Sequence, residues 1–255
     1  MNRIKNLFQK KKDILSIYYT AGYPALGDTL AIAEALEESG ADLLEIGFPY
    51  SDPVADGPII QASSKQALDN GMDLKLLFEQ LKDLRAKVSI PVLLMGYVNP
   101  MLQFGVENFC KACAEVGVDG CIVPDLPMTE YEELYQDVFA AHGLTNIFLV
   151  TPQTSAERIE KIDQLSNSFI YLLSSSATTG QNLEVGNTTE AYFARIADLK
   201  LNNPTMIGFG ISSKETFDKA CRYANGAIIG SAFVKDLDAE DIRGSVKNFM
   251  RKFKP

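Results

Sequence analysis

The sequence predicts a single α/β domain folded as a (β/α)8 TIM barrel, with an additional N-terminal helix and an extra short helix after the second strand. Three observations lead to this class. Short apolar runs alternate with amphipathic stretches along the whole chain, which is typical of a parallel sheet covered by helices. Eight such units occur in 255 residues, the usual size of a closed barrel. No linker rich in Pro, Gly or Ser divides residues 1–255.

The predicted elements follow one another without a break. After an amphipathic start, strands are expected at 14–20, 42–48, 91–97, 120–125, 146–152, 169–175, 205–210 and 226–231. Amphipathic segments such as 28–40 and 74–87 predict helices between them. Gly40, Gly117 and Gly143 follow predicted helices, where a left-handed residue is easiest for glycine. Eight units favour a closed barrel over an open doubly wound sheet, which usually has fewer strands.

Two connections are longer than a plain barrel needs. Residues 49–71 form an excursion after the second strand, with a turn-rich loop and the extra helix. Residues 175–190 form a polar stretch after the sixth strand. Both connections lie at the C-terminal face of a barrel, where active sites are built.

The charge balance restricts the partners. Asp and Glu number 33 against 24 Lys and Arg, for a net charge of −9. This balance argues against a broad surface for nucleic acid or for an anionic membrane. A small phosphorylated substrate remains compatible, because backbone N–H groups can bind phosphate. No apolar run approaches the ~20 residues that cross a bilayer, and none resembles a signal peptide, so we expect a cytoplasmic protein.

Glu45 is the most informative single residue. It lies inside an apolar strand, where burying an unpaired charge is costly. It is either a structural carboxylate held by an ion pair or hydrogen bonds, or a general acid or base with a raised pKa. Its position near the C-terminal end of a barrel strand favours the second. Asp52, Asp56 and Asp125 follow strands too, but Asp also stabilises turns.

Glycine-rich turns follow the last two predicted strands. The run GFGIS at 208–212 leads into a helix, and Gly230 and Ser231 end the eighth strand. Exposed N–H groups at such turns bind anions, and barrels often hold phosphate between the last two strand–helix loops. The alternative is a pair of tight turns that simply need small residues.

Metal and nucleophilic chemistry have little support. The only histidine, His142, stands at a predicted helix end, where it suits a capping role. Cys110 and Cys113 form a C-x-x-C pair, but at helical spacing and without a second pair, so packed thiols are expected. We therefore predict no metal site. Carboxylate acid–base chemistry on a phosphorylated substrate is what remains.

The stretch LEIGFPYSDPVADGPIIQ at 44–61 closely resembles the signature of tryptophan synthase alpha subunits. The resemblance continues through 93–100, 117–127, 169–180, 207–212 and 226–235. It implies a lyase of tryptophan biosynthesis that splits indole-3-glycerol phosphate into indole and glyceraldehyde 3-phosphate by retro-aldol cleavage.

The resemblance also implies roles for individual residues. Glu45 matches the glutamate that moves protons, Asp56 the aspartate that binds the indole N–H, and Tyr171 a tyrosine near them. The positions that match the phosphate site are Gly180, Phe209, Gly210, Gly230 and Ser231. Tyr18 and Tyr97 are candidates for the indole pocket, and Asp52 and Thr179 match a pair that joins when the two long loops close.

A beta subunit is the partner that the resemblance implies, in an alpha2beta2 heterotetramer. Pyridoxal phosphate is expected only in that partner, with no cofactor in this chain. Ser175 and Ala177 depart from the arginine and glycine of many relatives, which puts loop closure and coupling in doubt. Three alternatives stay open: a stand-alone indole-3-glycerol phosphate lyase, a non-catalytic phosphate-binding activator of a beta subunit, and another phosphate-binding barrel such as a sugar-phosphate isomerase or indole-glycerol phosphate synthase.

Overall fold

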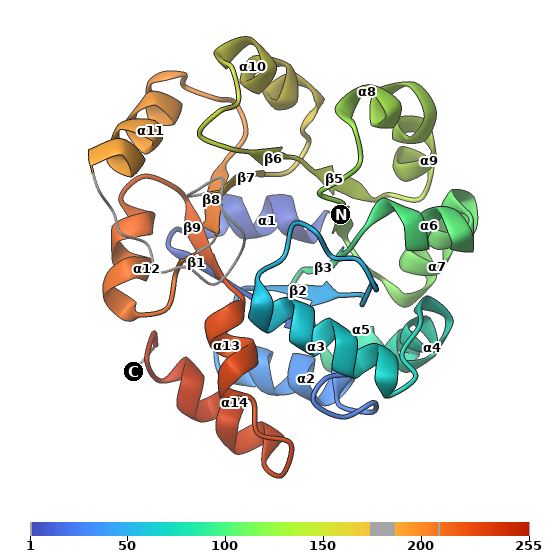
Figure 1. Cartoon of the computed structure of the whole chain (residues 1–255). Helices are drawn as coiled ribbons and strands as arrows, with labels where there is room; N and C mark the ends of the chain where they lie inside the picture. The colour runs from blue at the N-terminus through green and yellow to red at the C-terminus, as the bar shows by residue number, and fades with distance from the viewer. Residues whose placement is uncertain (1, 174–186, 209, 255) are drawn as a thin grey trace.

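One parallel sheet forms the centre of the molecule (Figure 1). The computed structural model describes residues 2–173, 187–208 and 210–254. Within these residues the strands are β1 (Ile14–Thr20), β2 (Leu43–Gly47), β3 (Val92–Met95), β4 (Gly120–Ile122), β5 (Thr145–Ile147), β6 (Leu149–Val150), β7 (Ile170–Leu173), β8 (Thr205–Gly208) and β9 (Gly226–Ile229). Their order is β5-β4-β3-β2-β1-β9-β8-β7-β6.

The sheet closes into a barrel where its two outer strands meet in the chain. The outer strands β5 and β6 are consecutive in the chain and are separated only by Phe148. They are two halves of one barrel strand, since β5 pairs with β4 and β6 pairs with β7, both in parallel. The predicted barrel of eight strand positions is therefore confirmed, with its fifth strand interrupted.

Helices surround the barrel as an outer ring (Figure 1). The described helices are α1 (Arg3–Lys10), α2 (Thr29–Glu38), α3 (Pro58–Asp69), α4 (Leu74–Gln80), α5 (Leu84–Lys87), α6 (Val98–Phe104), α7 (Val106–Val116), α8 (Met128–Glu130), α9 (Gln136–Ala141), α10 (Ala156–Leu165), α11 (Asn187–Asp198), α12 (Lys214–Cys221), α13 (Ser231–Asp236) and α14 (Ile242–Met250). A 3-10 turn, η1 (Leu81–Asp83), lies between α4 and α5, and a π-helical segment, η2 (Tyr131–Tyr135), between α8 and α9. None of these helices is long and apolar enough to cross a bilayer.

The expected helices are present with one difference of detail. The extra helix after the second strand is α3, which spans 12 residues and begins at a proline in its first position. The helix expected over 74–87 is divided by η1. Gly40, Gly117 and Gly143 have φ angles of 91°, 82° and 70°, as the left-handed prediction requires.

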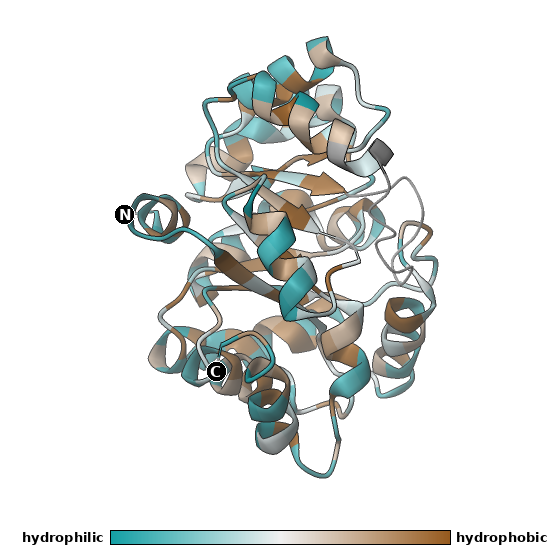
Figure 2. Ribbon diagram, turned by 90° about the vertical axis from the view of Figure 1, so that its left-hand side faces the viewer, coloured by the Kyte–Doolittle hydropathy of each residue, from teal (hydrophilic) through white to brown (hydrophobic). Residues whose placement is uncertain are grey.

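Apolar side chains fill both faces of the sheet. Figure 2 shows mainly hydrophobic strands, surrounded by helices that contain both hydrophobic and hydrophilic residues. The barrel interior contains Ile4, Ile14, Leu43, Leu93, Ile122, Ile147, Phe169, Tyr171, Met206 and Ile228. Because Ile4 belongs to this group, α1 covers the end of the barrel at which the strands begin (Figure 2). The other end remains available for a site.

Two buried carboxylates bind residues of the N- and C-terminal segments at the end of the barrel that α1 covers. Asp119 accepts hydrogen bonds from Arg3 at 2.9 Å, from Arg85 at 2.7 Å and from the backbone N–H of Val92 at 2.9 Å. Asp42 forms ion pairs with two lysines, one after α1 and one near the C-terminus. Removing one member of such a buried group leaves the others uncompensated, so loss of either carboxylate should destabilise the barrel base.

Candidate active site

A cavity of about 320 Å³ opens at the C-terminal ends of the strands. Its polar lining includes Tyr18, Glu45, Asp56, Tyr171, Ser212 and Ser231, and its apolar lining includes Ile59, Ile60, Met95, Ile211 and Ile228. The structure thus brings both predicted carboxylates and two predicted tyrosines to one place. An apolar hollow with a few convergent polar groups is the usual form of a small-molecule site.

Glu45 extends from β2 into this cavity and has no exposed surface. Its Oε1 accepts a hydrogen bond of 2.8 Å from Ser16 Oγ on β1. Its Oε2 has no hydrogen-bond partner among the described residues. Burial raises the pKa of Glu45 to about 8, against the opposing effect of the bond from Ser16. The carboxyl therefore carries its proton at neutral pH and can both give and take one.

Asp56 lies in the loop between β2 and α3. Burial raises its pKa to about 6, against the opposing effect of a 2.9 Å hydrogen bond that Tyr97 donates to Oδ2. The Tyr97 oxygen in turn accepts a 3.1 Å bond from the backbone N–H of Ala55. Asp56 is therefore mainly ionised at neutral pH, where Glu45 is mainly protonated. Two neighbouring carboxyls with separated pKa values can hold different roles.

Two glycines make room for the tyrosines of the cavity. A Cβ at Gly47 would lie 2.2 Å from the Tyr18 hydroxyl, and a Cβ at Gly208 would lie 2.0 Å from the Tyr171 hydroxyl. A side chain at either position would displace the ring above it. Gly47 and Ser16 were missed at the sequence level, whereas Gly208 was predicted only as part of a phosphate-binding turn. The spacing of two residues between Glu45 and Gly47 was the available signal, since it puts both on the same face of a strand.

The predicted phosphate residues are only partly described. Gly210, Gly230 and Ser231 line the cavity. Gly210 has a φ of 75°, and Gly230 is the N-cap residue that precedes α13. Gly180 and Phe209 lie outside the described residues, as do Thr179, Ser175 and Ala177. Lys235 and Lys252 also line the cavity, and nothing in the sequence pattern had indicated these two cations.

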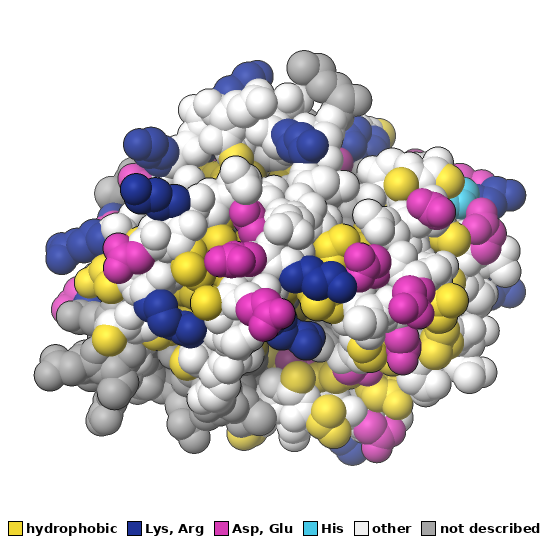
Figure 3. All heavy atoms as spheres, turned by 90° about the horizontal axis from the view of Figure 1, so that it is seen from above, with side chains coloured by type: hydrophobic (Ala, Val, Ile, Leu, Met, Phe, Trp, Pro, Cys, Tyr) yellow, Lys and Arg dark blue, Asp and Glu magenta, His cyan; other side chains and the backbone are white. Residues whose placement is uncertain are grey.

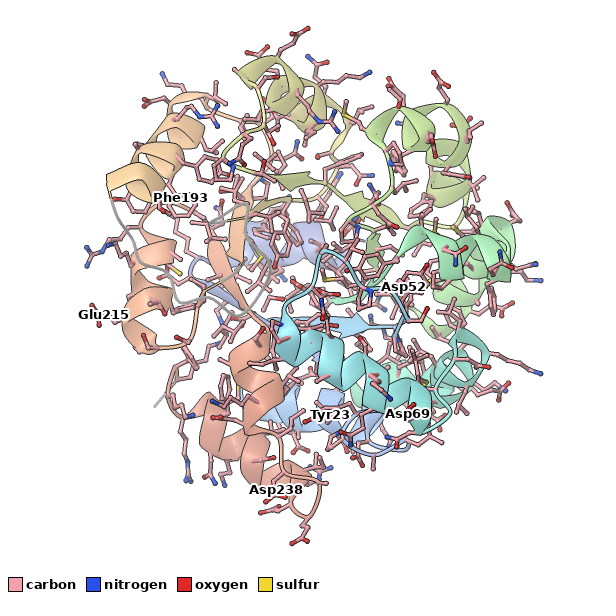
Figure 4. All side chains as sticks on the ribbon, in the orientation of Figure 1. Tyr23, Asp52, Asp69, Phe193, Glu215 and Asp238 are labelled. Atoms are coloured by element: carbon pink, nitrogen blue, oxygen red, sulfur yellow. The ribbon has the colours of Figure 1, made fainter. Side chains whose placement is uncertain are left out.

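Other predicted residues lie beside the cavity or away from it. Tyr97 lines a small adjoining hollow that it shares with Tyr18 and Asp56. Asp52 is exposed in the loop before α3 (Figure 4). Asp125 accepts a 2.8 Å bond from the N–H of Val98 at the start of α6, which matches the structural alternative for this residue.

The histidine and the paired cysteines have structural surroundings. His142 is the C-cap residue of α9, and its ring nitrogen lies 2.8 Å from a carboxylate oxygen of Glu107 on α7. Cys110 and Cys113 are buried and free within α7. The described residues contain no group of three or more His, Cys, Asp or Glu placed to hold a metal. Figure 3, a view from the α10 side, shows acidic and basic side chains interspersed rather than gathered by sign.

Fold and cavity together define a class of protein. The chain is a (β/α)8-barrel enzyme whose cavity carries carboxyl groups suited to acid–base catalysis.

Comparisons with known proteins give the family. The model of the tryptophan synthase alpha chain family matches residues 4–254. The tryptophan synthase alpha chain of Flavobacterium psychrophilum is 57% identical over 250 residues, covering 98% of either chain. That of Christiangramia forsetii is 56% identical over 254 residues, covering 100% of this chain and 99% of the relative. This chain belongs to the tryptophan synthase alpha chain family.

Solved structures agree with this assignment. The crystal structure of tryptophan synthase subunit alpha from Legionella pneumophila superposes with a TM-score of 0.88 at 33% identity, covering 99% of this chain and 98% of that one. An aminoacrylate-bound tryptophan synthase from Mycobacterium tuberculosis gives 0.86 at 27% identity over 99% of this chain and 98% of that one. The chain is accordingly a lyase of tryptophan biosynthesis, which cleaves indole-3-glycerol phosphate to indole and glyceraldehyde 3-phosphate.

Proposed function

We propose that the cavity performs this cleavage as a retro-aldol reaction in which Glu45 moves protons and Asp56 binds the indole ring. One observation carries the proposal: two carboxyls line one cavity, with pKa values that burial raises to about 8 and about 6. Residues 1–255 would act as one barrel domain, with all the catalytic groups in the same cavity.

The bond to be broken joins indole C3 to the glycerol phosphate chain. Glu45 gives a proton to C3, which converts the ring into an indolenine cation. The carbon–carbon bond then breaks, and its electron pair restores the indole ring. The hydroxyl on the departing carbon loses its proton and becomes the aldehyde of glyceraldehyde 3-phosphate. Glu45 takes up that proton, so the carboxyl is regenerated. A positioned acid–base group contributes roughly 10²–10⁴ in rate.

Asp56 stabilises the cation at the other side of the ring. Its ionised carboxylate accepts the indole N–H, which carries more positive charge after protonation at C3. The bond from Tyr97 to Oδ2 fixes the carboxylate without occupying its other oxygen. Tyr171 and Tyr18 enclose the ring from two strands, and the apolar lining keeps water away from the charges. Charges placed before the reaction stabilise its transition state most effectively.

The phosphate is assigned to the glycine turns. Gly210, Gly230 and Ser231 line the cavity at the ends of the last two strand–helix connections. Gly180 and Phe209, which match the family's phosphate positions, would complete the group. The matching pair Asp52 and Thr179 would join the two long loops over the bound substrate. Closure of this kind excludes water and completes the site.

The proposed partner is a beta subunit that carries pyridoxal phosphate, in an alpha2beta2 heterotetramer. Indole would pass to it from the C-terminal face of the barrel, around Pro49. The side chain of Val54 in the loop after β2 is consistent with a docking role, because it is apolar and 78% exposed.

The test measures indole release from indole-3-glycerol phosphate, with and without a beta subunit. Glu45→Gln should lower release by at least a hundredfold, whereas Glu215→Gln on the exposed face of α12 should leave it unchanged. Strong stimulation by the beta subunit supports the synthase, and fast unaided release supports a stand-alone lyase. Absence of release under every condition would contradict the catalytic assignment and support an activator.

A further inference from the structure

A chain of three buried hydroxyls runs from the cavity into α3. Tyr18 Oη lies 3.4 Å from Thr20 Oγ1, and Thr20 Oγ1 lies 2.7 Å from Ser63 Oγ. Ser63 Oγ donates a 2.9 Å bond to the backbone carbonyl of Ile60. The two inner hydroxyls are almost completely buried, with Thr20 0% and Ser63 1% exposed.

The chain has a direction, which follows from counting protons. A carbonyl oxygen can only accept, so the single proton of Ser63 goes to Ile60. Thr20 must then donate to Ser63, because Ser63 has no second proton. Tyr18 must in turn donate to Thr20. One arrangement of protons satisfies all three contacts, and in it the Tyr18 proton points away from the cavity.

Tyr18 is close enough to the catalytic carboxyls for this direction to matter. It stands opposite Glu45 in the β1–β2 register and lines two hollows together with Asp56. Burial and then the charge of Asp56 raise the pKa of Tyr18, against the opposing effect of the contact with Thr20. The phenol therefore keeps its proton at every ordinary pH. Where that proton points decides whether Tyr18 competes for the Asp56 carboxylate.

We propose that Thr20 and Ser63 are positioning residues that hold the Tyr18 proton away from Asp56, so that Asp56 stays basic and open to the indole N–H. The inference rests on the proposed function of Asp56. If the chain is broken, the Tyr18 proton is free to turn into the cavity that Asp56 also lines, where the carboxylate is an acceptor for it. A hydrogen bond to the charged form of an acid lowers its pKa. It also occupies an oxygen that the substrate needs.

The other groups around Asp56 do not depend on this chain. Tyr97 donates to Asp56 from the loop after β3, and Tyr171 on β7 and Glu45 on β2 line the same cavity. At the cavity rim, Lys252 on the C-terminal segment is paired with Asp236 on α13, and Lys235 lies beside them. None of these side chains belongs to the hydroxyl chain of Tyr18, Thr20 and Ser63.

The variants separate the effect of the direction of the Tyr18 proton from the effect of side-chain packing. Thr20→Val removes the acceptor of the Tyr18 proton. Ser63→Ala removes the acceptor of the Thr20 proton, so that Thr20 can donate to Tyr18 and the phenol proton can turn toward the cavity. Tyr18→Phe removes that proton altogether. Thr20→Ser restores a hydroxyl at the same position. The matched control is Thr29→Val, which removes another fully buried hydroxyl, one that accepts from Gly22 and is not part of the chain.

The first readout is the acidic limb of kcat/KM for indole release, which reports ionisation in the free enzyme. Thr20→Val and Ser63→Ala should move this limb to lower pH by about one unit and lower the optimal rate roughly tenfold. Thr20→Ser and Thr29→Val should keep the wild-type limb. Tyr18→Phe should not move it downward, because the variant has no proton to donate.

A second readout is the carboxyl carbon-13 titration of Asp56, identified by its loss in Asp56→Asn. It should show the same downward shift in Thr20→Val and Ser63→Ala. Because it needs no turnover, it tests the chain even if the wild-type protein releases no indole. An Asp56 titration that is unchanged in both variants, or that moves downward equally in Tyr18→Phe, would overturn the inference.

Discussion

Glu45 should destabilise the folded protein at neutral and alkaline pH. Burial raises its pKa to about 8 from an ordinary value of 4.5. The folded state therefore binds the Glu45 proton more tightly than the unfolded state does. Between these two values the unfolded chain releases a proton that the folded chain retains, so the free energy of unfolding falls as pH rises. Replacing the carboxyl with an uncharged amide should remove this penalty.

The magnitude follows from the two pKa values. One unit of pKa difference corresponds to about 1.4 kcal/mol. Below about pH 4 both states are protonated, and Glu45→Gln should have little effect on stability. The variant should be more stable than the wild type by about 3 kcal/mol at pH 7 and about 5 kcal/mol at pH 9. The amide can still accept the hydrogen bond from Ser16, so that contact changes little.

Urea unfolding of the wild type, Glu45→Gln and Glu215→Gln across this pH range provides the assay. Glu215→Gln removes the same charge from an exposed position and controls for net charge. The difference between Glu45→Gln and wild type should grow with pH, while the control difference stays near zero. A stability difference at Glu45 that is the same at pH 4 and pH 9 would refute the reasoning, because the carboxyl would then have no raised pKa.

Three further predictions follow from the described contacts. Tyr97→Phe removes a donor to Asp56 and should move the acidic limb of kcat/KM above about pH 6; an unmoved limb would show that the bond does not affect this ionisation. Gly47→Ala places a Cβ 2.2 Å from a tyrosine hydroxyl and should lower kcat/KM for indole release, whereas Gly27→Ala, with open space around it, should not; equal rates in the two variants would contradict the close contact. Asp119→Asn removes the charge of a buried carboxylate that pairs with two arginines. It should lower the free energy of urea unfolding by about 3 kcal/mol without changing the activity of the folded enzyme. A loss of activity without a loss of stability would argue against this purely structural role.

The barrel could be predicted because its signal is repeated in every unit. Each strand is buried on both faces and therefore reads as an apolar run, and each helix reads as an amphipathic stretch. The features that the sequence could not show were local interruptions of these elements. The fifth strand is interrupted at Phe148 within a continuous apolar run. The segment 74–87 looks like one helix, but η1 divides it.

The candidate site could be predicted where a polar or charged side chain lies in an apolar segment of the sequence. A charged Glu45 inside an apolar strand stands out from sequence alone. Ser16 and Gly47 do not, because the residue type alone does not indicate which side chain lies next to it. Their importance comes from neighbours on adjacent strands, such as Glu45 beside Ser16 or Tyr18 beside Gly47, and that information depends on strand register.

The pH profile of kcat/KM for indole release tests the central claim most directly. The proposed cleavage requires Asp56 to be ionised and Glu45 to be protonated in the free enzyme. The profile should therefore be bell-shaped, with limbs near their pKa values of about 6 and about 8. A rate that stays constant from about pH 5 to about pH 9, or one that keeps rising above pH 8, would contradict the proposal that a protonated Glu45 delivers the proton.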